Sequence, residues 1–164
     1  MQAEMTIKKP DLLKLTLIFS AVGLIIPGFT AIVLLGFQMM LSSFGLECHN
    51  AWTVLWTITI ISGLTLPVLF YRHLKNLTDK KIRNLKNRLL FFNLMEYTFI
   101  QASLALFFTN GHTLCYVSDG QNGLELVFTA WLALPILIGL SVLFGKTLKT
   151  INDKEIKAHT ANNS

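Results

Sequence analysis

The sequence predicts an all-α integral membrane protein, a four-helix bundle with short loops and both termini in the cytoplasm. Apolar residues make up 52% of the chain and charged residues only 14%, whereas a soluble domain has about 25% charged residues. Four apolar segments are each long enough to cross a hydrocarbon core, which needs ~20 residues. The lysines and arginines avoid two of the three connections between these segments. Together these observations favour a multi-pass topology over a soluble bundle.

We expect a single membrane domain over residues 1–164. The predicted spans, listed in chain order, are about 15–41, 52–71, 89–109 and 124–144. The charge-free run at the first span is too long for the apolar core of a cleaved signal peptide, so we expect this span to be retained. The polar end of the chain, about 150–164, is expected to be disordered.

A basic segment over 72–88 joins the second and third spans. It contains a single acid, Asp79, and seven cations: Arg72, Lys75, Lys80, Lys81, Arg83, Lys86 and Arg88. The other basic residues lie near the two ends of the chain, so the positive-inside rule places the basic segment and both termini in the cytoplasm. We expect the seven cations to contact anionic lipid headgroups rather than nucleic acid.

The third span carries a polar stripe. Asn93, Glu96, Tyr97 and Gln101 fall within an arc of about 140° at 100° per residue. Glu96 is the only ionisable residue deep inside a span, and a charged carboxylate at such depth costs several kcal/mol. We therefore expect the stripe to face the bundle interior and Glu96 to be a hydrogen-bonded, mostly neutral acid.

Three roles for this polar site stay open. It could be a proton or ligand site, a set of hydrogen bonds that hold helices together, or a lateral contact with another protein. Ser20, Ser62 and Thr65 lie at matching depth and could bond Glu96.

The two cysteines, Cys48 and Cys115, fall in the two predicted outer loops. In an oxidising exterior this placement favours a disulfide between the loops. One alternative is two unpaired thiols. Another is a Cys₂His₂ zinc site with the neighbouring His49 and His112, although adjacent Cys and His cannot easily chelate the same ion. We expect no metal, no cofactor and no enzymatic activity, because the sequence has no catalytic constellation.

A small multi-pass protein with short outer loops offers mainly its lateral helix faces. We therefore expect it to bind another membrane protein laterally. The stretch from Leu69 to Phe92, LFYRHLKNLTDKKIRNLKNRLLFF, together with the overall layout, resembles bacterial inner-membrane immunity proteins against pore-forming colicins. That resemblance implies a protein of the bacterial inner (cytoplasmic) membrane that blocks an incoming bacteriocin pore domain within the membrane. Conjugative exclusion proteins follow the same logic.

Two alternatives belong to other classes. One is a small proton-coupled transporter or channel that uses Glu96. The other is an accessory subunit of a larger membrane complex.

Overall fold

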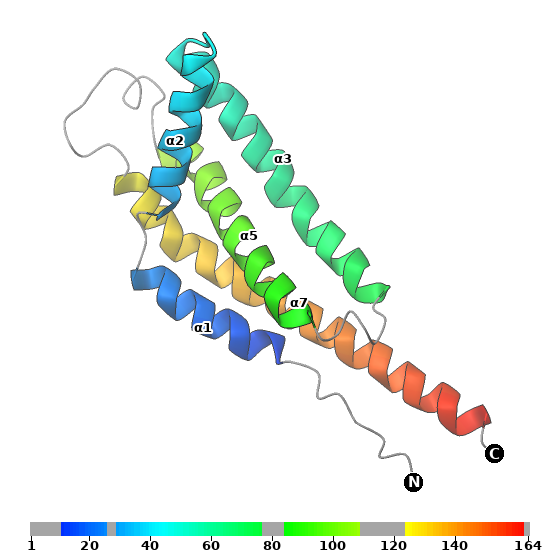
Figure 1. Cartoon of the computed structure of the whole chain (residues 1–164). Helices are drawn as coiled ribbons and strands as arrows, with labels where there is room; N and C mark the ends of the chain where they lie inside the picture. The colour runs from blue at the N-terminus through cyan, green and yellow to red at the C-terminus, as the bar shows by residue number, and fades with distance from the viewer. Residues whose placement is uncertain (1–10, 26–28, 77–83, 109–123, 163–164) are drawn as a thin grey trace.

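The computed structural model describes residues 11–25, 29–76, 84–108 and 124–162. These residues form five α-helices and no strand, so the predicted all-α class is confirmed (Figure 1). The helices are α1 (Leu12–Ile25), α2 (Phe29–Ser43), α3 (Cys48–Lys75), α5 (Leu85–Phe108) and α7 (Leu124–Asn162).

The described helices run along the bundle in four segments of alternating direction, and each such segment is called a pass below, whether or not it crosses a membrane. Phe70 of α3 stacks on Phe92 of α5, whereas Trp52 of α3 clusters with Ala102 of α5, so these two helices are antiparallel. Phe144 of α7 also meets Phe92. The first pass consists of α1 followed by α2, with α1 packed on α5 and α7, and α2 on α3 and α5 (Figure 1).

The predicted continuous span over 15–41 is corrected to two helices, α1 and α2. Helix α1 ends at Ile25 and α2 begins at Phe29, and the sequence between them contains Pro27 and Gly28. A proline inside a helix has no N–H to bond the carbonyl four residues earlier and its ring clashes with that turn. Glycine has a low helix propensity. Both residue types disfavour one helix that continues from α1 into α2.

The predicted basic loop over 72–88 is also shorter than expected. Helix α3 continues to Lys75 and α5 begins at Leu85. Arg72, His73 and Lys75 occupy the last turn of α3, where positive charge interacts favourably with the negative end of the helix dipole. The charges that were expected to form the loop thus help to extend the helix.

Helix α7 continues to Asn162, so the prediction of a disordered tail over about 150–164 was wrong for most of its length. Residues 146–162 contain neither glycine nor proline and are rich in lysine, with Glu155 and Ala158 among them. These are good helix formers, and the backbone therefore continues the helix past the apolar segment.

Two of the described helical segments are long and apolar enough to cross a membrane, Cys48–Lys75 and Phe128–Ile151. The apolar segments Leu12–Gly23 of α1 and Ile32–Ser43 of α2 are shorter. Because α1 and α2 follow one another along the bundle, the first pass reaches its length only as a pair.

Two apolar clusters hold the passes together. The larger one joins α1, α3, α5 and α7 and includes the end of the bundle where α3 finishes and α5 starts. Phe70, Phe92 and Phe144 pack there, with ring centroids 4.6–5.3 Å apart. The smaller cluster joins α2, α3 and α5 around Trp52 and the small residues Ala102 and Ala105. Small residues allow helices to approach closely.

The aromatic cluster makes a prediction about stability. Phe92 is 2% exposed, whereas its neighbour Phe91 is 63% exposed. We expect Phe92→Ala to lower the free energy of unfolding by about 3 kcal/mol, because it leaves a cavity between three helices. The matched variant Phe91→Ala should change it by no more than about 0.5 kcal/mol. Denaturant unfolding in mild detergent measures both, and equal losses would contradict the packing described here.

Candidate functional site

The polar stripe of α5 is buried. Asn93, Glu96, Tyr97 and Gln101 are each at most 2% exposed. Buried polar groups are costly unless they are hydrogen-bonded. Their partners therefore decide whether the stripe is structural or holds something else.

Three of the four side chains bond the two helices of the first pass. The Asn93 amide donates to Thr16 Oγ1 in α1 at 3.0 Å. The Tyr97 hydroxyl donates to the Gly23 carbonyl in α1 at 3.1 Å. Near the start of α2, Thr30 donates to the Gln101 side-chain oxygen. These bonds advance in the same order along α5 and along α1 and α2, so α5 and the first pass run parallel.

The Tyr97 hydroxyl bonds a carbonyl in the last turn of α1. Within a continuous helix the carbonyl of Gly23 would accept from the amide of residue 27. Residue 27 is proline and has no N–H. The Tyr97 hydroxyl takes the place of that donor, and the ring packs edge-on against Phe19. Tyr97 thus stabilises the last turn of α1.

Glu96 lies apart from the other three. It stands 100° from Tyr97 around the helix, at the edge of the polar arc, and lines a hollow between α3, α5 and α7. The hollow has a volume of about 450 Å³, and its other lining residues are mainly apolar. The described lining residues include no lysine, arginine or histidine, so Glu96 has no ion-pair partner among them.

One carboxylate oxygen of Glu96, Oε2, is buried and has no hydrogen-bond partner among the described residues. The partners expected from the sequence do not reach it. Thr65 donates to the carbonyl of Ser62 within α3, and the Ser20 hydroxyl in α1 is itself buried without a partner in the described chain. An unsatisfied buried carboxyl group beside a hollow is a site that can accept a further polar group.

The described residues include only one of the two cysteines of the predicted disulfide. Cys48 is the first residue of α3, and the Gln38 amide donates to its sulfur at 3.0 Å. Cys115 and His112 lie outside the described residues, so the disulfide and the alternative zinc site stay predictions. Within the described ranges no group of three or more His, Cys, Asp or Glu side chains could hold a metal ion.

The predicted lipid-contacting cations divide between helices. Arg72 and Lys75 lie on α3, and Lys86 and Arg88 on α5. Arg88 donates to a ring nitrogen of His73 at 2.8 Å. The remaining three, Lys80, Lys81 and Arg83, fall in 77–83, outside the described residues.

Sequence reasoning missed one residue of interest. Lys146 of α7 was assigned to the basic C-terminal region, but it lines a groove together with Lys75 of α3. Lys146 comes directly after the apolar run of α7 and Gly145, which gave no signal that it would lie near α3. Only the adjacency of α3 and α7 brings the two to one groove.

Comparison with protein-family models, with curated proteins and with solved structures gave no match for this chain. The geometry of the site therefore carries the functional argument alone.

The Tyr97 bond can be tested directly. We expect Tyr97→Phe to lower the free energy of unfolding by ~1 kcal/mol, because the Gly23 carbonyl loses its donor inside the bundle. Tyr71→Phe is the matched control, since the ring that contacts Lys75 is kept, and it should change stability by less than about 0.5 kcal/mol. Denaturant unfolding of both variants in the same detergent decides; a Tyr97→Phe variant as stable as the control would refute the role given to the hydroxyl.

Proposed function

We propose that this protein is a non-enzymatic multi-pass membrane protein that acts by lateral binding of another membrane protein. In this proposal all four passes lie in the membrane. The lysines and arginines lie near the two ends of the chain and around the connection between α3 and α5, and the positive-inside rule then places both termini in the cytoplasm.

The observation that carries the proposal is the exposure of α3. In the most apolar stretch of α3, only 22% of the residues are buried within the described chain, compared with 39% in the corresponding stretch of α7. Val54, Ile58, Ile61 and Leu69 lie within about 80° of one another around α3 and are exposed. Contiguous exposed apolar faces mark protein or lipid contact sites.

A partner helix is a suitable occupant for this stripe. Transmembrane helices associate through close packing of side chains, and the stripe presents a smooth row of mainly β-branched residues with few rotamers to lose. The opposite side of α3 already packs on α5. A partner helix that binds the stripe would thus use a face of α3 that the described bundle leaves exposed.

Immunity against a pore-forming bacteriocin is the specific version of this function that we propose, with conjugative exclusion as a close variant. Support comes from the layout, with short connections and a basic segment between the second and third passes. A protein of this kind needs no catalytic group, because blocking a pore domain requires only a matching lateral surface. An accessory subunit of a larger membrane complex would use the same face.

The binding stripe is tested with two isoleucines of equal exposure. Ile58 of α3 is 53% exposed and Ile18 of α1 is 54% exposed. We expect Ile58→Trp to reduce recovery of a crosslinked membrane partner roughly tenfold, because an added bulky ring costs ~1–3 kcal/mol in a packed interface. Ile18→Trp should leave recovery unchanged.

The readout is a pulldown from the native host in mild detergent, with crosslinking and mass spectrometry. Recovery of a toxin, a conjugation component or a complex subunit with wild type identifies the class of partner. If only the protein itself is recovered, or if both tryptophan variants lose the partner equally, the stripe is not the binding face.

Proton-coupled transport is a second candidate, and the Glu96 hollow favours it. The buried carboxyl group of Glu96 has one oxygen with no hydrogen-bond partner among the described residues, and it lies beside a hollow of about 450 Å³. Such a group is suited to take up and release a proton. Intramembrane acids commonly mark such relays. The hollow lies between three helices, where small helix movements can change access to it.

Glu96→Gln separates the two functions. Under transport, this variant should abolish proton flux into liposomes loaded with a pH-sensitive dye, while remaining folded, because the amide cannot exchange the proton. Glu47→Gln is the control, since Glu47 is exposed. If wild-type liposomes show no flux above empty ones, transport is excluded; partner capture that survives Glu96→Gln supports lateral binding.

A further inference from the structure

The hollow beside Glu96 has small residues in two of its three helices. Gly63 of α3 has no side chain and Ser103 of α5 has a short one, which leaves space between α3, α5 and α7. The lining includes both exposed and buried residues. Leu64 of α3 is 71% exposed and Ile136 of α7 is 44% exposed, whereas Glu96 is 2% exposed. The hollow therefore extends from the outer side of α3 and α7 to the buried carboxyl group.

Two hydrogen-bond acceptors at this hollow lack their regular donors. One is Glu96 Oε2, which is buried without a partner among the described residues. The other is the carbonyl of Gly63, which in a regular helix would accept from the amide of residue 67. Residue 67 is a proline inside α3 and has no N–H. Because Gly63 and Pro67 both line the hollow, and a helix carbonyl points toward the residue four positions later, this carbonyl lies on the same side of α3 as the hollow.

The described lining has no side-chain donor for these acceptors. The one other polar side chain among the described lining residues, Ser103, already donates to the carbonyl of Phe99 at 2.7 Å. The remaining described side chains of the lining are apolar. A ligand that fits this hollow must therefore bring apolar surface together with N–H or O–H donors of its own.

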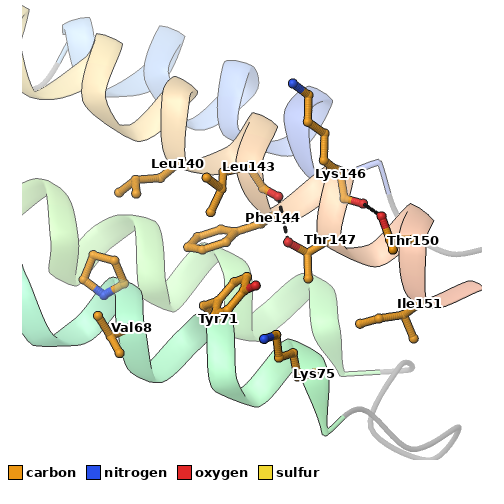
Figure 2. A pocket seen from close by; sticks show the side chains of 11 residues that line it. Val68, Tyr71, Lys75, Leu140, Leu143, Phe144, Lys146, Thr147, Thr150 and Ile151 are labelled. Carbon is orange, nitrogen blue, oxygen red and sulfur yellow. Dashed lines mark hydrogen bonds between the residues drawn. The ribbon is translucent and has the colours of Figure 1, made fainter.

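The larger groove between α3 and α7 offers no such convergence of polar groups. It has a volume of about 930 Å³ and is lined by Lys75 and Lys146, but the two lysine side chains lead away from each other (Figure 2). Thr147 and Thr150 donate their hydroxyl protons to backbone carbonyls of α7. The hollow beside Glu96 is thus the site at which polar groups from two helices meet.

We propose that this hollow binds a lipophilic amine, with the nitrogen at the Glu96 carboxyl group and the Gly63 carbonyl, and the hydrocarbon part against Leu64, Ile100 and Ile136. An ammonium group has only donors and no acceptor, which matches a site that has acceptors and no free donor. The volume of about 450 Å³ lies within the range of small-molecule sites, about 300–1,000 Å³. One carboxyl group and one carbonyl are too few ligands for a metal ion such as Ca²⁺.

Binding of the amine conserves the proton. A lone carboxylate deep in a membrane is costly, so the acid holds a proton when the hollow contains no amine. A neutral amine that arrives through the hydrocarbon takes up this proton: the O–H bond of Glu96 breaks, an N–H bond forms at the nitrogen lone pair, and an ammonium–carboxylate pair results. The pair has no net charge and is stabilised by charge-assisted hydrogen bonds.

This ligand site goes beyond lateral binding, because it does not use the exposed stripe of α3. It shares Glu96 with the transport candidate but requires no proton flux. Equilibrium binding without a gradient therefore tests it separately from both functions.

The experiment is equilibrium dialysis of the full-length protein in nanodiscs, with empty nanodiscs as the blank. The probes are 1-naphthylmethylamine and 1-naphthalenemethanol, which share one ring system and differ in the amine and the hydroxyl group. Wild type should bind the amine roughly tenfold more tightly than the alcohol, because hydrogen bonds between charged groups are the stronger ones. Glu96→Gln should abolish this preference, whereas Glu47→Gln, which removes an exposed carboxylate, should keep it.

Two tryptophan variants of α7 locate the bound ring. Ile136 and Leu132 are 44% and 47% exposed, and of the two only Ile136 belongs to the described lining. We expect Ile136→Trp to weaken binding of both probes about fivefold, because the added ring occupies the apolar part of the hollow. Leu132→Trp should leave binding of both probes unchanged.

Three results would overturn the proposal. Equal binding of the two probes by wild type would show a hollow that accepts any apolar body, such as an acyl chain. A preference for the amine that survives in a folded Glu96→Gln variant, with helix content verified by circular dichroism, would place the amine elsewhere. Equal losses in the two tryptophan variants would do the same.

Discussion

The hydrogen bonds that α5 makes with α1 and α2 are the interactions on which the rest of the structure depends. The first pass consists of two helices, α1 ending at Ile25 and α2 beginning at Phe29, rather than one continuous helix. Asn93, Tyr97 and Gln101 replace that continuity by bonding one half, the end of that half and the other half in turn. A broken helix is thereby held along a continuous one.

This arrangement also explains why Glu96 differs from its polar neighbours. The side chains that bond the first pass lie on one side of α5, and Glu96 lies at the edge of that arc, toward α3 and α7. It therefore contributes nothing to the bonds with α1 and α2 and keeps an oxygen without a partner in the described chain. The polar stripe contains two different features, a structural set of hydrogen bonds and a carboxyl group beside a hollow.

The packing of α3 and α7 also combines two features, a tightly packed part and a groove. Near the aromatic cluster of Phe70, Phe92 and Phe144 the helices are tied to α5. Beside that cluster they leave a groove with an apolar part and a basic end. The outer face of α3 remains largely uncovered. A small bundle has too few side chains to cover every helix face, and the uncovered faces are those for which we propose binding.

Local composition and helix periodicity were enough to predict the helical class, the place of each apolar segment and the burial of the α5 stripe, but not the division of the first apolar segment into two helices. The sequence by itself did not determine how far α3 and α7 extend, since charged residues such as Lys75 are compatible with a helix end as well as with a loop. Only the tertiary structure decided that Tyr97 reaches the Gly23 carbonyl while Glu96 turns to a hollow, and that Lys75 and Lys146, which are 71 positions apart, share one groove. Periodicity relates residues on one helix, whereas these relationships depend on which helices pack together and in which direction.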